Sequence, residues 1–118
     1  MNKSGATMRA ADLSDDQIVE LAEMFRLMGD PSRLRIIAAC LAEPTYVSDL
    51  AARLGLSQPL VSHHLRLLRA ARVLRAERKG KQMFYEAADE HVTRVIDDMA
   101  AHVCEHPASD LEDGMRSD

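Results

Sequence analysis

The chain has few aromatic residues and no tryptophan among its 118 residues. Its four aromatic side chains are Phe25, Tyr46, Phe84 and Tyr85. So few rings argue against an aromatic-rich β-sandwich and against a stacking surface for single-stranded nucleic acid. Since 47% of the residues are hydrophobic, the chain can bury one modest core. Length and composition therefore predict a single, mainly helical domain.

Cysteines and long hydrophobic runs are also scarce. Cys40 and Cys104 are too few for a disulfide framework and form no Cys-x-x-Cys pair, which excludes a structural zinc finger. No apolar run approaches the ~18 residues that a membrane-spanning helix needs. The start of the chain carries Lys3 and Arg9 with no hydrophobic stretch behind them. We therefore expect a soluble cytoplasmic protein without a membrane partner.

The net charge of −4 argues, at face value, against a nucleic-acid partner. The charge is unevenly distributed, however. Residues 53–81 contain eight Lys or Arg residues and one acid, a net +7 that leaves −11 for the rest of the chain. This segregation predicts one basic face on an acidic body, suited to a polyanion, although an ordinary solvated face is the alternative.

Capping and breaking residues divide the first part of the chain into four helices. The expected starts are Ser14, Pro31, Ser48 and Ser57, and the expected ends lie at about Met28, Glu43, Gly55 and Ala71. Tyr46-Val47 is compatible with a very short strand before the third helix. Two short helices joined around a glycine indicate a helix-turn-helix.

A β-hairpin and a last helix are expected after these four helices. Segments 73–77 and 82–86 contain strand-forming residues and flank the turn Arg78-Lys79-Gly80-Lys81. Asp89 begins a helix over about 90–105 that Pro107 stops. The predicted fold is mainly α, a winged helix-turn-helix of five helices plus a β-hairpin wing. We expect residues 13–107 to form this domain, between a flexible extension (1–12) and an acidic flexible tail (108–118).

The fourth helix has two different sides. Val61, Leu65 and Leu68 share one stripe that faces the core, with His64 at its border. We expect His64 to be packed and His63 to be exposed. The opposite side carries side chains that reach phosphates or base edges from the major groove, namely Gln58, Ser62, His63, Arg66 and Arg69. At the wing tip, Arg78, Lys79 and Lys81 are placed for DNA phosphates. The pattern predicts double-stranded DNA as partner, the alternative being a basic helix used only in protein contacts.

The last helix carries candidate metal ligands at both of its ends. His91 and His102 share a face but lie ~16 Å apart along the helix axis, too far for one ion. In an antiparallel pair of such helices, Asp89 and His91 of one copy can meet His102 and Glu105 of the other. Two imidazoles and two carboxylates suit Zn(II) and similar divalent ions. The alternative is four ordinary solvated side chains.

Other residues of this helix support or complicate that site. An apolar seam for helix pairing is formed by Val92, Ile96, Met99 and Val103. His106 lies close to the ligand face and is an additional or substitute ligand, so Glu105 is the least secure of the four. Helix geometry points Cys104 away from the ion, and we interpret it as a small packing residue. Cys40 is expected in the core.

Three stretches of the sequence form a recognisable set, namely Gly29-Asp30-Pro31-Ser32-Arg33-Leu34-Arg35-Ile36, the segment Leu56 to Leu68, and Arg78 to Tyr85. Together they resemble the ArsR/SmtB family of bacterial metal-sensing winged-helix repressors. The resemblance covers residues 15–106. It implies a homodimer through the first and last helices, and DNA contacts by Gln58, Ser62 and His63. The order Asp-x-His-x10-His-x2-Glu is also similar to the family's zinc-sensing pattern. The family's cysteine pair beside the helix-turn-helix is absent from Tyr46 to Leu50, which argues against a thiolate site for arsenic, cadmium or lead there.

These observations predict a repressor whose metal-free dimer binds a palindromic operator and is released by Zn(II), with Co(II) or Ni(II) as alternatives. The resemblance implies that the second ring nitrogen of His102 passes the signal to backbone near Arg72. One rival is a thiol- or persulfide-responsive repressor using Cys40 and Cys104, and another is a protein-interaction module. An enzyme is the weakest hypothesis, because the sequence has no nucleophile–base pair, phosphate loop or open metal motif. We expect no small organic substrate.

Overall fold

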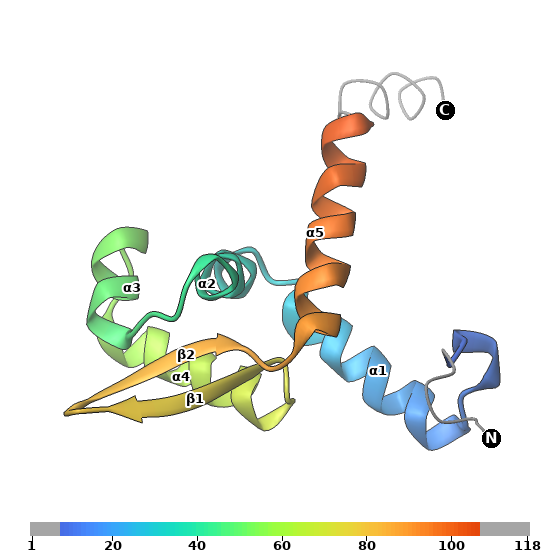
Figure 1. Ribbon diagram of the computed structural model, residues 1–118, viewed down its shortest axis with the longest axis horizontal. Coiled ribbons are helices and arrows are strands. Elements are labelled where there is room, and N and C mark those ends of the chain that lie inside the picture. Colours follow the sequence, from blue (N-terminus) through green and yellow to red (C-terminus); the bar gives the residue numbers. More distant parts are fainter. Residues whose placement is uncertain (1–7, 107–118) are drawn as a thin grey trace.

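The computed structural model describes residues 8–106, which form helices and one β-hairpin (Figure 1). The elements are η1 (Ala10–Asp12), α1 (Asp15–Met28), α2 (Pro31–Ala42), α3 (Val47–Leu54), α4 (Gln58–Ala70), β1 (Leu74–Lys79), β2 (Gln82–Ala87) and α5 (Glu90–Glu105). The short 3₁₀ helix η1 lies within the segment expected as an extension. The expectations for residues 1–7 and 107–118 lie outside the described residues.

The starts of three helices are built as their capping residues predict. Ser14 and Gln17 form a reciprocal capping box at α1, each side chain accepting a hydrogen bond from the other's backbone N–H. At α2, the Asp30 carboxylate accepts from the Arg33 N–H at 3.0 Å. At α4, the Ser57 hydroxyl accepts from a backbone N–H in the first turn. Local sequence therefore sets where these helices begin.

The start of α3 differs from the prediction. Ser48 does not cap this helix, since its N-cap is Tyr46 and the helix begins at Val47. Nor do Tyr46 and Val47 form a strand. Instead, the neighbouring Thr45 makes an antiparallel bridge with Tyr85 of β2, with N–H···O distances of 3.0 and 2.7 Å. Because the extended residue is Thr45, the chain turns into the helix earlier than Ser48 suggested.

The core lies where the helices of the helix-turn-helix meet the base of the β-hairpin. Its fully buried side chains come from α2, α3, α4 and β1 and the turn before β1, and are Ile36, Ile37, Cys40, Leu50, Val61, Leu65, Leu68, Val73 and Leu74. The predicted stripe of Val61, Leu65 and Leu68 is confirmed. Since α4 is held by this stripe, its opposite side is left for other contacts.

Gly55 ends α3 in the left-handed conformation, with φ +68° and ψ +33°. An added Cβ would meet no atom within 4 Å, so only the backbone conformation opposes a side chain there. We expect Gly55→Ala to lower the free energy of unfolding by about 1–2 kcal/mol, measured by urea denaturation at one fixed protein concentration. Equal stability of the two proteins would contradict this account of the turn.

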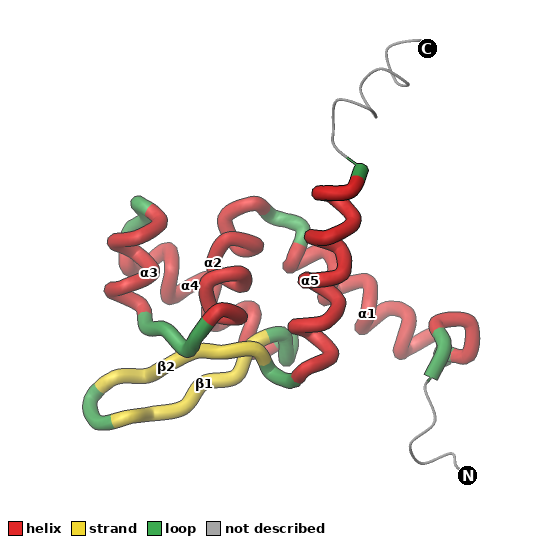
Figure 2. The backbone as a smooth tube through the Cα atoms, turned by 45° about the horizontal axis from the view of Figure 1, so that its top comes forward, coloured by secondary structure: helices red, strands yellow, loops and turns green. Residues whose placement is uncertain are grey.

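Helices α1 and α5 extend away from the body formed by α3, α4 and the wing (Figures 1 and 2). On α5, Val92 is buried and Ile96 packs against the core, whereas Met99 and Val103 are 55% and 64% exposed. Helix α1 likewise exposes Phe25. The second half of the predicted seam is thus uncovered in a single chain. Cys104 is exposed too, so its interpretation as a packing residue is wrong within one chain.

None of the helices in residues 8–106 is long and apolar enough to span a membrane.

Candidate functional site

The polar side of α4 is open, as predicted. Gln58, His63, Arg66 and Arg69 are exposed and Ser62 is half-buried, while the apolar stripe of the same helix is fully buried. Gln58 and Ser62 lie in the N-terminal half of the helix. This is the half that meets base edges when a recognition helix lies in a major groove.

Ion pairing divides the eight basic residues of segment 53–81 into two groups. Arg53 pairs with Asp49 at 3.2 Å, Arg75 pairs with Glu86 at 2.8 Å, and Arg72 pairs with Glu20 of α1. The other five have no carboxylate partner within residues 8–106 and are exposed, namely Arg66, Arg69, Arg78, Lys79 and Lys81. We call these five residues the basic surface. They are the five cations that the sequence predicts to contact DNA.

The wing turn is tighter than predicted. Arg78 and Lys79 are the last residues of β1 rather than turn residues, since Lys79 lies opposite Gln82 in the hairpin. Gly80, with φ +65°, permits this two-residue turn. The observed strands, Leu74–Lys79 and Gln82–Ala87, end two residues and one residue later than the predicted segments 73–77 and 82–86. As a consequence, Arg78 and Lys79 are presented from a paired strand, and Lys81 lies in the turn.

Aromatic contacts hold the wing against the start of α3. The Phe84 ring meets Tyr46 edge-on at 5.3 Å between centroids, and the Lys79 ammonium lies 5.7 Å from the Phe84 centroid. Together with the Thr45–Tyr85 bridge, these contacts join β2 to the helix-turn-helix. The wing and α4 are thus parts of one packed unit.

The two adjacent histidines differ as predicted. His63 is exposed, whereas His64 is only 7% exposed, and its Nδ1 accepts a hydrogen bond from Nε of Arg33 at 3.1 Å. Burial, with the nearby Arg33 guanidinium, lowers the pKa of His64. Sequence reasoning foresaw that His64 packs, but not its partner, since nothing in the sequence pairs residues 31 positions apart.

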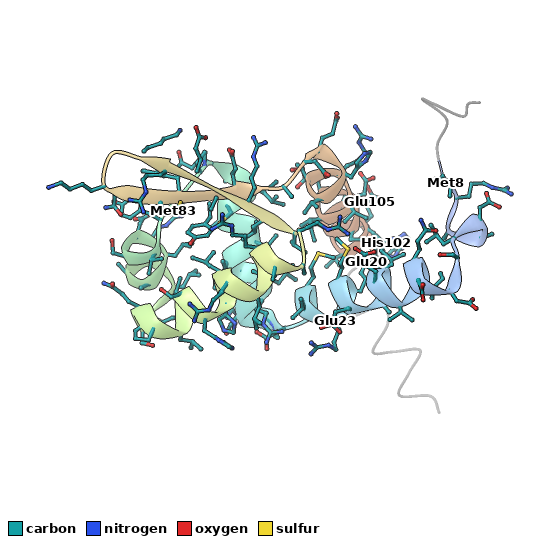
Figure 3. The ribbon with its side chains drawn as sticks, turned by 90° about the horizontal axis from the view of Figure 1, so that it is seen from below. Met8, Glu20, Glu23, Met83, His102 and Glu105 are labelled. Atoms are coloured by element: carbon teal, nitrogen blue, oxygen red, sulfur yellow. The ribbon has the colours of Figure 1, made fainter. Side chains whose placement is uncertain are left out.

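The metal-ligand candidates of α5 stand at its two ends. Asp89 is the N-cap, and its Oδ1 accepts from the N–H groups of His91 at 2.9 Å and Val92 at 3.2 Å. This fixes the carboxylate beside His91. His102 and Glu105 lie near the other end of the helix, and Figure 3 shows both on α5, far from Met83 on the wing.

Within one chain these residues do not converge. No group of three or more His, Cys, Asp or Glu side chains is placed to hold a metal ion in the described part of the chain. The donor types nevertheless fit a divalent ion, and all four side chains are exposed. His106 is close to His102, with ring centroids 4.7 Å apart, so both it and Glu105 stay candidates for the fourth ligand. A site from these residues needs a second chain.

Comparison with known proteins identifies the family to which this chain belongs. The sequence profile of the bacterial regulatory protein arsR family matches residues 30–76. The transcriptional repressor SmtB homolog of Synechocystis is 40% identical over 93 residues, which are 79% of this chain and 70% of that protein. The chain belongs to the ArsR family. The same segment that forms α2, α3, α4 and the start of β1 carries the profile match.

Two mycobacterial members of the ArsR group extend the comparison. NmtR of Mycobacterium tuberculosis is 32% identical over 98 residues, 83% of this chain and 82% of its own. The solution structure of apo-NmtR has a TM-score of 0.68 and covers 86% of this chain and 85% of its own, at 31% identity. The cadmium metal-sensor CmtR of Mycobacterium tuberculosis is 39% identical, with a TM-score of 0.58 over 65% of this chain and 80% of its own. The structural match confirms the predicted fold, which solved relatives of the chain share as a winged helix-turn-helix DNA-binding domain. Both NmtR and CmtR are HTH-type transcriptional regulators.

The two thiols of this ArsR-family chain lie in different environments. Cys40 is 2% exposed, and burial raises the pKa of its thiol to about 12. A thiolate is the reactive form, so Cys40 is unreactive near neutral pH. Only Cys104 is exposed. The two cysteines therefore do not have the environments that a paired thiol switch requires.

Proposed function

We propose that this ArsR-family chain is a metal-responsive transcriptional repressor. As a metal-free homodimer it binds operator DNA, and it is released when Zn(II) or a similar divalent ion binds at two sites between the subunits. The observation that carries the proposal is the separation of two features. The basic surface lies on α4 and the wing, while the donor set of His91, His102 and their acidic neighbours lies along α5 and at its N-cap. Figure 3 labels His102 and Glu105 of this set.

DNA reading follows from the geometry of α4. Gln58, Ser62 and His63 contact base edges from the first half of the helix, and Arg66 and Arg69 contact phosphates from its later turns. The wing tip adds Arg78, Lys79 and Lys81 to the backbone of the same duplex. Since no described carboxylate pairs with these cations, DNA binding breaks no ion pair among residues 8–106.

Metal sensing requires the dimer. The support for this is the uncovered apolar face of α1 and α5, with Met99 exposed between the two halves of the donor set and Val103 exposed next to His102. Asp89 and His91 of one subunit and His102 with Glu105 or His106 of the other complete a four-ligand site. A bound divalent ion supplies a bridge between the subunits. His102 uses its second ring nitrogen to contact backbone near Arg72, where the chain leaves α4.

Two properties of the metal response follow from this arrangement: its coupling to DNA binding and its sensitivity to pH. If metal weakens DNA binding, DNA weakens metal binding by the same factor. Protons compete with the metal because His91 and His102 must be neutral to act as ligands, so the metal response is expected to weaken as the pH falls.

The test is a metal titration of the protein on a fluorescent duplex, which wild-type protein selects from a random-sequence library. Adding Zn(II) is expected to release the duplex, and comparison with Co(II) and Ni(II) identifies the preferred ion. Tight DNA binding unaffected by all three ions would contradict metal sensing. Failure to select any duplex would contradict DNA binding itself.

Replacing the exposed thiol separates the metal response from a redox response. We expect Cys104→Ser to bind the duplex and to respond to Zn(II) as wild type does, since Cys104 lies outside the donor set. The thiol oxidant diamide is expected to leave wild-type DNA binding unchanged, because Cys40 is buried with a raised pKa. Release by diamide, or loss of the Zn(II) response in Cys104→Ser, would favour the thiol-responsive alternative.

A further inference from the structure

Arg33 and His64 form a directional link between α2 and α4. The Arg33 backbone is fixed in the first turn of α2 by the Asp30 cap, and its Nε donates to Nδ1 of His64 at 3.1 Å. Within residues 8–106 this is the one side-chain hydrogen bond that joins a residue of α4 to another helix. His64 is nearly buried, while its neighbour His63 is exposed on the proposed DNA-binding side.

The rest of the attachment of α4 is apolar. Val61, Leu65 and Leu68 are fully buried and hold the helix against the core, but apolar burial is non-directional. The buried stripe determines which face of α4 meets the core. A hydrogen bond prefers a narrow range of distance and angle, so the Arg33–His64 contact adds a directional restraint on the rotation of the helix about its own axis.

We infer that Arg33 is a positioning residue for DNA recognition: by donating to a neutral His64, it holds α4 in the rotation that presents Gln58, Ser62 and His63 to the bases. This inference rests on the proposed DNA-binding function. Arg33 acts through His64 and itself touches no DNA.

The protonation state of His64 is part of this link. Nδ1 accepts, so the ring proton is on Nε2, and a doubly protonated imidazolium has no lone pair to accept with. Protonation would also place two positive charges side by side. The charged and titratable groups acting on His64 are Arg33 and Asp30 on the α2 side and His63 on its own helix; Arg33 and His63 lower the pKa of His64, and Asp30 opposes them. Acidification is therefore expected to break the link, at a pH below 6.5.

The first experiment separates positioning from direct phosphate contact. Metal-free Arg33→Lys and Arg33→Met proteins are compared with wild type on the wild-type-selected duplex, by fluorescence anisotropy at several salt concentrations. Lysine keeps the charge but not the Nε donor. Both variants are expected to bind about 10-fold more weakly with an unchanged salt slope. Wild-type affinity in Arg33→Lys, or a lower slope in Arg33→Met, would overturn the inference.

The second experiment measures DNA affinity as a function of pH, because a purely structural role of His64 would leave this pH dependence unchanged. Asparagine places Oδ1 where histidine has Nδ1, so His64→Asn can accept from Arg33 without titrating. Both proteins carry His63→Gln, so that the neighbouring exposed imidazole on the proposed DNA-binding side does not contribute to the comparison. As the pH falls from 7.5 to 5, the affinity of the protein with His64 is expected to drop by about 10-fold and that of His64→Asn to stay level. Parallel profiles would contradict the role of His64.

Folding is followed by circular dichroism in every variant and at every pH, so that a loss of affinity is counted only for folded protein. Should Arg33→Met unfold, Arg33→Lys and the pH profile still decide the question. If wild-type protein selects no duplex, the proposed DNA-binding function fails and this inference fails with it. If it selects a duplex that the Arg33 variants bind equally well, only this inference fails.

Discussion

His102→Ala is expected to bind the selected duplex with wild-type affinity and to lose release by Zn(II). The coupling between effector and ligand sites is typically about 5- to 150-fold in affinity, and we expect wild type to show a change of that size on adding Zn(II). Removing one imidazole leaves the site with three ligands and removes the residue that faces the α4–β1 turn in our proposal. The measurement is DNA affinity by anisotropy with and without Zn(II).

The matched control for this experiment is Glu90→Gln. Glu90 is an exposed carboxylate in the first turn of the same helix, but it already pairs with Arg94 at 2.8 Å and lies outside the proposed donor set. It is expected to keep the Zn(II) response. Normal release in His102→Ala would refute the assignment of the metal site, whereas a lost response in both variants would indicate a general effect of changing α5.

The triple variant Arg78→Ala/Lys79→Ala/Lys81→Ala is expected to reduce DNA affinity by about 10³-fold, with a log–log salt slope less steep by up to about 5 in the dimer. Each cation that neutralises a phosphate releases counterions, and the wing tip carries three such cations in each subunit. The readout is affinity across a salt series.

Paired arginines of the same segment provide the comparison. Arg53→Ala/Arg75→Ala removes two positive charges per subunit, and because their partners are Asp49 and Glu86, no free cation is lost. A small change in slope is expected. If this double variant loses as much slope as the triple variant, ion pairing does not distinguish the cations that meet DNA.

Sequence patterns predict the structure best where the interacting residues are close together in the chain. The capping box at Ser14 and the buried stripe of α4 depend on residues three or four positions apart, and both are confirmed. The error at Ser48 arose because Thr45 pairs with Tyr85, 40 positions away. The Arg33–His64 bond was missed for the same reason. Composition likewise identified the basic segment but not which of its arginines are neutralised by Asp49, Glu86 and Glu20.

The metal site involves contacts between two chains. Spacing along one helix identifies its candidate ligands, but within residues 8–106 these ligands do not converge on one point. Whether Glu105 or His106 completes the donor set depends on where the partner helix lies, and both are exposed near His102. A zinc titration of Glu105→Ala and His106→Ala proteins would distinguish these two candidates.

The contacts between the wing and α3 bear on how a signal can travel. Thr45 is bridged to Tyr85, and Phe84 contacts both Tyr46 and Lys79. These contacts hold the wing to the start of α3, so the wing moves together with the helix-turn-helix. In the proposed function, the helix-turn-helix and wing of each subunit therefore meet DNA as one rigid unit. What can change is the distance and tilt between the two units of the dimer, which must match the helical repeat of the duplex. Under this proposal, a small movement of α5 on metal binding takes both units out of register with their half-sites at once.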